Sequence, residues 1–307
     1  MKWISAAELA TLAPYADIVE ALRDGFRSDT QTPVRHHHDT SEFTTLLLMP
    51  AWSKQFTGLK TVTVKTDNAA LGLPTVQGAY LLIDNATGAP VAMMDGTELT
   101  RRRTAAAGAL ASDYLSRKDS SALLLIGAGA LGAHFVKAHA AVRPIKTVLI
   151  YNRTPEKSET LAADLSSDGF DARAVTDLQA AMAEADIISG ITSSNQAIIK
   201  GAWLKPGTHI DLAGAFKPTM RETDAKAVGR ARVYVDTRGG AEAEAGDLIQ
   251  AQAEGQFEFG RIEGDLFQLC QGTMMGRKTE EEITLFKSCG TALEDLATAV
   301  MVHLRNA

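Results

Sequence analysis

A continuous apolar run that ends in three spaced glycines limits the folds open to this sequence. Residues 122–126 are Ala-Leu-Leu-Leu-Ile, and Gly127, Gly129 and Gly132 follow them. The run is typical of a buried strand in a parallel sheet, and the glycines fit the G-x-G-x-x-G pattern of dinucleotide-binding folds. In that pattern the glycines allow a tight turn, the approach of a pyrophosphate to the backbone, and close packing of the next helix. A second strand-like run, residues 147–151, follows where a Rossmann-type unit requires it, so we expect a dinucleotide site at the intervening helix N-terminus.

From Ser121 onward strand-like and helical segments alternate, which predicts a doubly wound parallel sheet. The preceding part differs, because it holds four consecutive β-forming segments: Thr44–Met49, Gly58–Lys65, Gln77–Asp84 and Pro90–Asp95. The expected fold class is α/β, a Rossmann-type doubly wound parallel sheet with an N-terminal α+β domain. We expect residues 1–117, joined by a C-terminal helix at 290–307, to form the first domain and residues 118–289 to form the second.

Two further stretches have helical patterns. Residues 5–27 place Ile18, Leu22 and Phe26 at helical spacing, which predicts an N-terminal helix. The tail, residues 280–305, has an apolar stripe and is expected to be mostly helical. Its acidic run, 280–282, would then lie in the first turn, where carboxylates suit the helix dipole.

The composition of this 307-residue chain argues against several classes of protein. Its net charge is −6 and it has no basic run interleaved with aromatics, which disfavours a nucleic-acid or anionic-membrane partner. No signal-peptide core and no membrane-spanning apolar stretch is visible, so a cytoplasmic protein is expected. Cys270 and Cys289 lack metal or redox spacing. Three consecutive histidines, His36, His37 and His38, cannot all project from one face of a strand or helix, so no metal site is expected.

The residues at the end of the second strand predict which dinucleotide binds. NAD sites usually place Asp or Glu there to bond the ribose 2′-hydroxyl, whereas NADP sites favour a nearby Arg. This chain has Asn152, Arg153 and Thr154. A guanidinium can hold a 2′-phosphate with two hydrogen bonds, and no carboxylate stands at this strand end to repel it. We therefore expect NADPH to be preferred, with NADH possible.

Short motifs are spread over essentially the whole chain. In the first domain they are Gly58-Leu-Lys60, Asn68, Gly72-Leu-Pro-Thr75-Val-Gln-Gly78, Asp84-x-x-x-Gly88, Leu99-Thr100 and Arg103-Thr-Ala-Ala. Near the C-terminus they are Ile283-Thr-Leu-Phe-Lys-Ser288-Cys-Gly290 and Glu294-Asp295. Together these motifs resemble the ornithine cyclodeaminase/mu-crystallin family. The resemblance implies a substrate-binding and dimerisation domain beside a Rossmann domain, a homodimer, and chemistry on a small cyclic or α-amino acid.

The resemblance also implies that cations of the first domain bind the carboxylate of the substrate. The matching positions are Arg35, Lys60 and Arg103, with Lys60 and Arg103 as the catalytic pair. The residues agree with this role, because Lys60 lies among apolar and β-branched neighbours, where a buried ammonium without an anionic partner is costly. Arg103 offers a planar fork for a carboxylate. For each cation, an ion pair within the protein or at its surface is the alternative.

The cofactor contacts that the glycine pattern and the resemblance together imply fall in several segments. In the glycine-rich segment they are Gly127, Ala128, Gly129, Ala130, Leu131 and Gly132. The others are Thr75, Arg103, Asn152, Arg153, Thr154, Thr192, Leu212, Ala213, Gly214 and Ser288. Thr192 ends a predicted strand, at the edge where open α/β sheets bind their ligands.

One position departs from the family pattern. Ornithine cyclodeaminases carry an aspartate where this chain has Phe216. A phenyl ring cannot exchange a proton or pair with an ammonium group, so ornithine cyclodeamination is disfavoured. Phe216 and Cys289 are instead expected to contact the substrate.

The segment 211–222, Asp-Leu-x-Gly-Ala-Phe-x-Pro-x-Met-Arg-Glu, resembles bacterial reductases of cyclic ketimines. This resemblance implies an oxidoreductase acting on CH–NH bonds, which uses NAD(P)H to reduce Δ1-pyrroline-2-carboxylate or Δ1-piperideine-2-carboxylate to L-proline or L-pipecolate. The ring nitrogen can enter as an iminium, so catalysis would need mainly positioning and electrostatics. Two alternatives stay open: an amino-acid dehydrogenase of the alanine dehydrogenase type, and a non-enzymatic NADPH-dependent binding protein of the mu-crystallin type.

Overall fold

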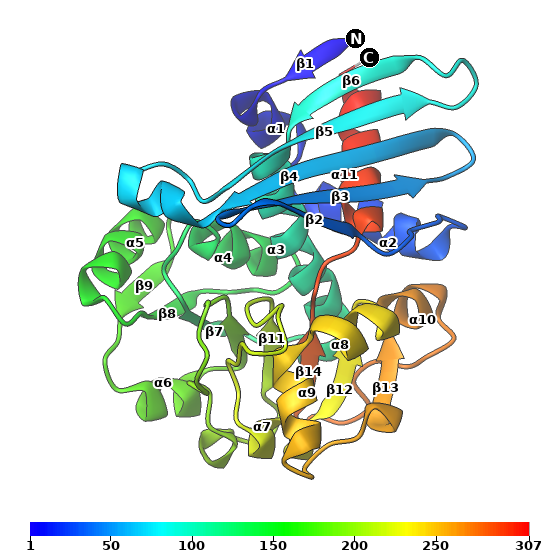
Figure 1. The fold of residues 1–307 in the computed structure, drawn as a ribbon. Helices are drawn as coiled ribbons and strands as arrows, with labels where there is room; N and C mark the ends of the chain where they lie inside the picture. Colours follow the sequence, from blue (N-terminus) through cyan, green and yellow to red (C-terminus); the bar gives the residue numbers. More distant parts are fainter. Residues whose placement is uncertain (307) are drawn as a thin grey trace. The chain divides into compact units, whose positions relative to one another are not determined.

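The computed structural model describes residues 1–306, which form two compact units (Figure 1). The first unit comprises Met1–Thr104 and the segment that begins at Thr291, and the second comprises Ala105–Gly290. The sequence places the first boundary at residue 117, whereas the structure divides the chain inside helix α3 (Gly96–Leu115). Helix α3 therefore contributes residues to both units.

The first unit is built on a six-stranded sheet in the order β1-β6-β5-β4-β3-β2. Strands β2 to β6 pair antiparallel in sequence order, and β1 pairs parallel with β6. The elements are β1 (Lys2–Ile4), α1 (Ala6–Leu12), α2 (Tyr15–Arg27), β2 (His36–Ser41), β3 (Thr44–Trp52), β4 (Phe56–Lys65), the 3-10 helix η1 (Thr66–Leu71), β5 (Val76–Asp84), β6 (Pro90–Asp95) and α11 (Ala292–Arg305). The Lys2 ammonium donates to the Asn306 side chain at 2.8 Å, so the two ends of the described chain lie side by side (Figure 1).

The two faces of this sheet have different environments. On one face a row of paired residues crosses five strands and is buried: Met49, Lys60, Tyr80, Met94 and Ile4. Helix α11 lies on this face, because a Cβ placed on Gly58 would meet the side chain of Leu296 at 3.1 Å. On the other face the adjacent row is apolar but only partly buried: Pro50, Leu59, Leu81, Met93 and Trp3. Trp3, at the end of that row, is 53% exposed.

The N-terminal helix expected over residues 5–27 is in fact two helices. Helix α1 begins at a capping box formed by Ser5 and Glu8, and α2 begins directly after Pro14. Proline has no backbone N–H and its ring clashes with a preceding helical turn, which explains the break. Helix α2 still buries the spaced apolar residues Ile18, Leu22 and Phe26.

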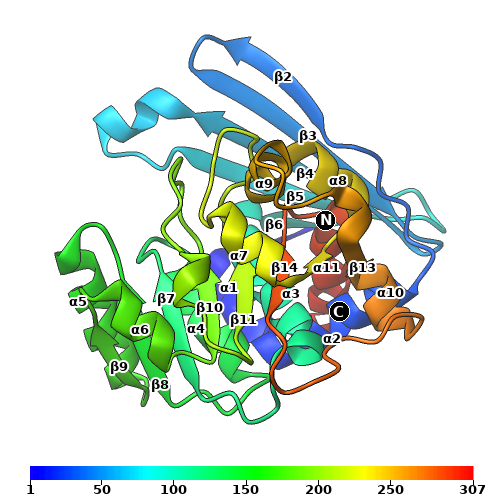
Figure 2. The same cartoon turned by 90° about the horizontal axis from the view of Figure 1, so that it is seen from below.

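The second unit contains an eight-stranded parallel sheet in the order β13-β12-β14-β11-β10-β7-β8-β9. Its strands are β7 (Ala122–Ile126), β8 (Thr147–Tyr151), β9 (Asp171–Ala174), β10 (Ile187–Gly190), β11 (His209–Leu212), β12 (Arg232–Val235), β13 (Ile262–Asp265) and β14 (Thr284–Lys287). Its helices are α4 (Gly132–Ala140), α5 (Pro155–Ser167), α6 (Leu178–Glu184), α7 (Ala225–Arg230), α8 (Arg238–Glu244), α9 (Gly246–Ala253), α10 (Leu266–Gln271) and the 3-10 helices η2 (Gly201–Trp203) and η3 (Phe259–Arg261). Figure 2 shows α4, α5 and α6 beside strands β7 to β10. The expected α/β class with a doubly wound parallel sheet is confirmed.

The strand order of this sheet reverses at β7. Strands β7, β8 and β9 follow one another in space, and β10 then pairs with the opposite side of β7. Open α/β sheets bind ligands beyond the carboxyl ends of the strands at such a reversal. Gly127 follows β7 and Thr192 follows β10, so the two predicted cofactor segments flank the reversal.

The prediction of a mostly helical tail is wrong for residues 280–290. Residues 284–287 form strand β14, which lies between β11 and β12 and is buried throughout. The helix α11 begins only after Thr291, whose hydroxyl caps it. The acidic residues 280–282 lie outside any helix. The strand was missed because its partners lie far away in the sequence, and no local signal marks that pairing.

Three further features bear on metal and membrane binding: the histidine run, groups of metal ligands, and long apolar helices. The three histidines lie on the exposed edge strand β2, with the rings of His36 and His38 6.3 Å apart. Within residues 1–306, no group of three or more potential ligands is arranged to hold a metal ion. The described part of the chain also has no helix with the length and apolar character needed to cross a membrane.

Candidate functional site

Two of the cations predicted to bind a substrate carboxylate lie around one buried carboxylate. Asp295 of α11 accepts from Lys60 Nζ at 2.9 Å and from Arg103 Nε at 3.0 Å, both through Oδ1. The second carboxylate oxygen of Asp295 lies 2.7 Å from Lys60 Nζ. The neighbouring Glu294 forms a further ion pair with Arg103. Strand β4, helix α3 and helix α11 thus meet in one charged cluster inside the first unit.

This cluster is almost completely buried. Lys60 is 1% exposed, Arg103 is 6% exposed, and Glu294 and Asp295 are fully buried. Charged groups in such a position need partners, because desolvation of an unpaired charge costs several kcal/mol. The cluster holds two cations and two carboxylates, so its formal charges cancel.

A tyrosine lies next to the cluster and requires a glycine in the neighbouring strand. Tyr80 is the cross-strand partner of Lys60, and its hydroxyl has no hydrogen-bond partner among the described residues. A Cβ on Gly58 would lie only 1.7 Å from that hydroxyl. Gly58 therefore provides the space for the Tyr80 ring end, which explains the glycine in the motif Gly58-Leu-Lys60.

The electrostatics of the cluster bring Lys60 close to its titration range. Burial and the charge of Arg103 lower the pKa of the Lys60 ammonium to about 8, against the opposing effect of Asp295. The charge of Arg35 lowers the pKa of Lys60 further. Arg35 is half-buried, ahead of strand β2. The same field acts on Tyr80, because burial and the Asp295 carboxylate raise the pKa of its hydroxyl.

The anionic half of this cluster is not predicted by the sequence. The C-terminal motif contains Glu294 and Asp295 but does not predict a role for them. Two adjacent acids in the mostly apolar first half of this helix are an unusual pattern, because fully buried carboxylates occur almost only with partners. That pattern predicts buried partners but not which cations supply them.

In the second unit the glycine-rich segment has the geometry expected from its spacing. Gly127 has φ +113°, a conformation that favours glycine. A Cβ on Gly132 would lie 2.6 Å from the side chain of Leu161, so this glycine allows α4 to pack closely. Around Gly129, by contrast, an added Cβ would meet nothing within 4 Å. The backbone at Gly129 is thus open to an approaching group.

Asn152 braces the glycine-rich segment. Its side-chain oxygen accepts from the backbone N–H of Ala128 at 3.1 Å, and its amide group donates to the Thr154 carbonyl at 2.9 Å. The predicted cofactor residue Asn152 therefore connects the end of β8 to the turn after β7. Arg153 is exposed, and within residues 1–306 it makes no ion pair or hydrogen bond.

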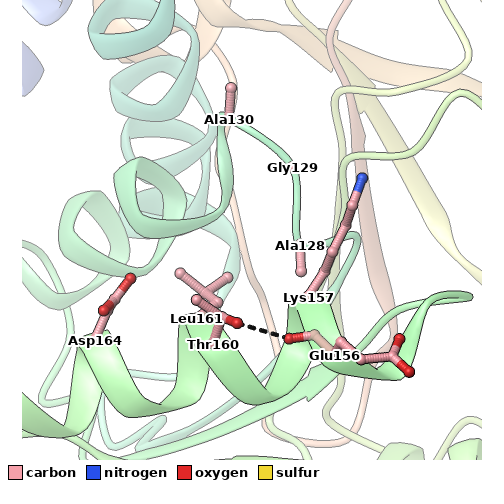
Figure 3. Close-up of a pocket in the computed structure, with 8 residues that line it drawn as sticks. All are labelled: Ala128, Gly129, Ala130, Glu156, Lys157, Thr160, Leu161 and Asp164. Atoms are coloured by element: carbon pink, nitrogen blue, oxygen red, sulfur yellow. Dashed lines mark hydrogen bonds between the residues drawn. The ribbon is translucent and has the colours of Figure 1, made fainter.

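A pocket of about 500 Å³ lies beside this segment (Figure 3). It is lined by Ala128, Gly129, Ala130, Glu156, Lys157, Thr160, Leu161 and Asp164. In Figure 3 the Lys157 side chain extends from the first turn of α5 on the side of the glycine-rich segment, whereas the Glu156 carboxylate points away from it. Lys157 and Glu156 were not among the predicted site residues, although they follow Arg153 by only a few positions.

The remaining predicted cofactor positions of this unit lie at the carboxyl ends of neighbouring strands. Thr192 follows β10, Leu212 ends β11, Ala213 and Gly214 follow it, and Ser288 follows β14. Two buried acids brace these ends. Asp236 accepts from Ser288 Oγ at 3.1 Å and from the Cys289 backbone N–H at 2.7 Å. Glu222 contacts Thr192 and Gly214.

The other predicted positions are distributed as follows. Thr75 and Arg103 belong to the first unit, and the Thr75 carbonyl accepts from the backbone of Lys65 at 2.8 Å. Phe216 is 45% exposed in the segment after β11, and Cys289 is buried after β14. Leu131 immediately precedes α4 and is half-buried.

The residues of the second unit fit a dinucleotide. The positive φ of Gly127, the open space at Gly129 and the pocket beside them provide a backbone cradle at the start of α4. Helix N-termini favour phosphate groups through their free N–H groups and dipole. The open strand ends at the reversal of the sheet agree with the same ligand class.

Known proteins resemble this chain along its whole length. The Δ1-pyrroline-2-carboxylate reductase of Paracoccus denitrificans is 39% identical, and the alignment covers 97% of this chain and 95% of the relative. Among solved structures, the Δ1-pyrroline-2-carboxylate reductase of Thermococcus litoralis, in complex with NADH and L-proline, superposes with a TM-score of 0.94 at 32% identity, over 99% of this chain and 97% of that one. An archaeal alanine dehydrogenase dimer with bound NAD gives a TM-score of 0.93 at 29% identity, over 99% and 95% of the two chains.

The family assignment rests on the sequence as a whole. The family described as ornithine cyclodeaminase/mu-crystallin matches residues 5–306. This range includes the Lys60–Arg103–Asp295 cluster and the glycine-rich segment with its pocket. The chain therefore belongs to the ornithine cyclodeaminase/mu-crystallin family.

Proposed function

We propose that this chain is an NAD(P)H-dependent oxidoreductase that reduces a cyclic ketimine, Δ1-pyrroline-2-carboxylate or Δ1-piperideine-2-carboxylate, to L-proline or L-pipecolate. The observation that carries the proposal is the buried cluster of Lys60, Arg103 and Asp295. The substrate in its iminium form carries one negative and one positive charge. A cluster with both cations and carboxylates can complement such a zwitterion. The 39% identity to a Δ1-pyrroline-2-carboxylate reductase supports the same reaction.

In the proposed mechanism the first unit orients the substrate. Arg103 and Lys60 bind the carboxylate, Arg103 through its planar fork and Lys60 as a point charge. Arg35 adds a third positive charge to the field at Lys60. Fixed cations in a buried setting hold the substrate in one orientation, which removes much of the entropic cost of the reaction.

The chemistry needs little acid–base catalysis. When bound, the reduced nicotinamide supplies the hydride. The hydride adds to C2 of the iminium, the C=N π pair moves to nitrogen, and the N–H proton already present stays on the product amine. This balance explains why a phenylalanine can stand at position 216. The 45% exposed ring of Phe216 offers apolar contact surface and no proton.

The proposal includes a preference for NADPH over NADH. Arg153 and Lys157 supply two cations within six residues after β8, and neither forms an ion pair within the described chain. Lys157 lines the pocket beside the glycine-rich segment. Both can pair with a 2′-phosphate. Glu156 opposes this effect, because a carboxylate in the same pocket can accept from a ribose hydroxyl instead.

The proposal also includes a homodimer. The row Pro50, Leu59, Leu81, Met93 and Trp3 forms an apolar stripe across five strands that is only partly buried. Stripes of this kind mark interaction surfaces, and a second copy of the same stripe is complementary to it in a two-fold dimer. The archaeal alanine dehydrogenase to which this chain is similar is a dimer.

A second candidate is an amino-acid dehydrogenase acting on a linear substrate. The structural similarity to the archaeal alanine dehydrogenase favours it. Such an enzyme would also need a carboxylate clamp, but it would depend strongly on ammonia in the reductive direction.

The decisive experiment is NADPH oxidation by the purified protein with each of the two cyclic imines, followed by absorbance. Pyruvate with ammonia, and L-ornithine with NAD⁺, serve as parallel substrates. We expect rapid oxidation with at least one imine and none with ornithine. Activity that appears only with pyruvate and ammonia would replace the proposal by the second candidate. Cofactor binding without turnover of any substrate would indicate a binding protein.

A further inference from the structure

Glu222 lies in the segment after β11 and connects the ends of two adjacent strands. Its Oε1 atom accepts from the backbone N–H of Thr192 at 2.6 Å and from the Thr192 hydroxyl at 2.9 Å. Its Oε2 atom accepts from the backbone N–H of Gly214 at 2.8 Å. Glu222 is 1% exposed. One carboxylate therefore holds the residues that follow β10 and β11, and both Thr192 and Gly214 are predicted cofactor positions.

The two glycines beside Glu222, Gly190 and Gly214, leave space for its carboxylate that a side chain would occupy. A Cβ on Gly214 would lie 2.3 Å from the Glu222 carboxylate, and one on Gly190 would lie 3.1 Å from it. The position of Glu222 thus requires a glycine at 214, and a side chain at position 190 would press against the same carboxylate. This close fit argues that the contact is built into the fold and is not a chance surface interaction.

Glu222 is itself held by a second acid. Asp247 Oδ1 accepts from the backbone N–H groups of Glu222 and Thr223 at 2.7 Å and 2.8 Å. Lys287 of β14 lies 3.5 Å from the other oxygen of Asp247, and both residues are fully buried. The charged groups that face Glu222 are therefore Asp247 from α9 and Lys287 from β14.

These contacts determine how Thr192 can interact with a ligand. Because the Thr192 hydroxyl donates its proton to Glu222, it can offer a ligand only its lone pairs. One of these accepts from the backbone N–H of Ser194 at 3.3 Å. A ligand group that meets Thr192 must then be a hydrogen-bond donor, and the carboxamide of nicotinamide has such a donor in its NH₂ group.

We propose that Glu222 is a positioning residue for the cofactor: it holds Thr192 as a hydrogen-bond acceptor and fixes the Gly214 segment at the strand edge where the nicotinamide half binds. This inference rests on the proposed function, because it assumes that a nicotinamide dinucleotide binds to the second unit. Glu222 need not touch the cofactor. It acts through Thr192 and Gly214.

The test compares two isosteric variants of buried acids. Glu222→Gln replaces one acceptor oxygen by an NH₂ group, which must then face an N–H or O–H donor. Asp186→Asn is the matched control, because Asp186 also accepts from two backbone N–H groups, those of Ser121 and Ala122, at 2.9 Å and 3.1 Å. Asp186 lies just before β10, at the opposite end of that strand from Thr192.

The measurements are the dissociation constant of NADPH, by fluorescence titration, and the thermal midpoint of each variant. We expect the NADPH dissociation constant to rise about tenfold or more in Glu222→Gln, a loss typical of a hydrogen bond to a charged group. Asp186→Asn should lower the thermal midpoint and change the dissociation constant less than about twofold. Equal dissociation constants for Glu222→Gln and the parent would overturn the inference and leave Glu222 a purely structural residue.

A pair of smaller substitutions tests the inference if Glu222→Gln does not fold. Thr192→Val removes the hydroxyl between Glu222 and the ligand, and Thr192→Ser retains it. We expect Thr192→Val to weaken NADPH binding and Thr192→Ser to retain the parent affinity. Equal binding by both variants would contradict the role given to the Thr192 hydroxyl.

The pH dependence of NAD⁺ binding provides a further readout. NAD⁺ is used because it lacks the 2′-phosphate of NADP⁺, whose own titration near neutral pH would complicate the measurement. Burial raises the pKa of Glu222 to about 7, with Asp247 acting in the same direction and Lys287 in the opposite one. Protonation removes an acceptor, so the parent should bind NAD⁺ less tightly below this pH, while Glu222→Gln should show no such change. A parent that binds NADPH but reduces no imine would refute the proposed function and leave this inference standing.

Discussion

The ammonium of Lys60 lies 2.7 Å from the carboxylate of Asp295, although the two residues are 235 positions apart in the sequence. The pair joins the central part of strand β4 to the C-terminal helix, and Arg103 shares the same carboxylate at 3.0 Å. The cations that we propose for substrate binding are thus held by the protein before any substrate arrives. Preorganised charges of this kind need no rearrangement during the reaction.

The first prediction concerns the pH dependence of carboxylate binding. Because the pKa of Lys60 is about 8, its ammonium loses its proton above that pH and its attraction for a carboxylate disappears. We expect the affinity for pyrrole-2-carboxylate, a planar analogue whose ring nitrogen does not titrate in this range, to fall above about pH 8. Calorimetric titration between about pH 6 and 9.5 measures it.

Lys60→Arg is the control for this prediction. A guanidinium stays protonated throughout this pH range, so the decline in affinity should be absent in this variant. The same alkaline decline in the parent and in Lys60→Arg would assign the titration to another group.

The second prediction concerns the stability that Asp295 provides. Asp295→Asn leaves Lys60 and one edge of Arg103 buried without their anion, and breaking a buried pair in this way typically costs about 3–5 kcal/mol. Asp17→Asn, which breaks the exposed pair between Asp17 and Arg305, should cost no more than about 1 kcal/mol. Urea unfolding measures how much each variant loses in free energy of unfolding relative to the parent. Similar losses in both variants would show that the buried Asp295 pair stabilises the fold no more than the exposed pair does.

The third prediction concerns the choice of cofactor. Arg153→Ala and Lys157→Ala should each raise the KM for NADPH by roughly tenfold, because each removes a charged partner of the 2′-phosphate. The KM for NADH should change little. Glu156→Gln removes a carboxylate from the same pocket, so it should raise kcat/KM for NADPH relative to kcat/KM for NADH. Steady-state kinetics with both cofactors decide the matter, and equal effects on NADPH and NADH would remove Arg153 and Lys157 from this role.

The fourth prediction concerns the oligomeric state. Leu59→Glu places a charge in the middle of the apolar stripe and should convert a dimer to a monomer, because a buried unpaired carboxylate at an interface costs several kcal/mol. Leu73→Glu is the control, since Leu73 is 52% exposed outside the sheet. Sedimentation velocity distinguishes the outcomes. A parent protein that is monomeric at micromolar concentration would refute the dimer itself.

The sequence predicts those parts of the fold that carry local signals. Strands β7 and β8 have the expected bounds because each is a short apolar run with a clear end. Strand β2 was missed because its histidines and polar residues on an exposed edge follow no apolar pattern. Strand β14 was missed because a buried lysine, Lys287, closes its short apolar run, and its identity as a strand depends on pairing with β11 and β12.

The candidate site also consists of residues with a local sequence signal and residues without one. The glycine-rich segment and the cations Lys60 and Arg103 are visible in the sequence, because their chemistry and spacing are local properties. The buried acids of the site are not visible in this way. Asp295 holds Lys60 and Arg103, Glu222 holds Thr192 and Gly214, and each acts on residues that only folding brings near. Asp236, for example, braces Ser288 from 52 positions away.

The fifth prediction concerns the energetic cost of the Glu222 contact. A carboxyl group whose pKa is raised on folding, here from 4.5 to about 7, favours the folded state in its protonated form. Its contribution to stability is therefore fully present below about pH 4.5 and is lost as the pH rises to about 7, by on the order of 3 kcal/mol. Glu222→Gln removes this titration, so the stability of the parent relative to Glu222→Gln should fall between about pH 5 and 8.

Chemical unfolding of both proteins across this range measures the difference in their free energies of unfolding. A difference that stays constant with pH would contradict the raised pKa of Glu222. If the decline is observed, the ionised Glu222 that cofactor binding requires is the form that destabilises the free protein, and bound cofactor should restore the lost stability above pH 7.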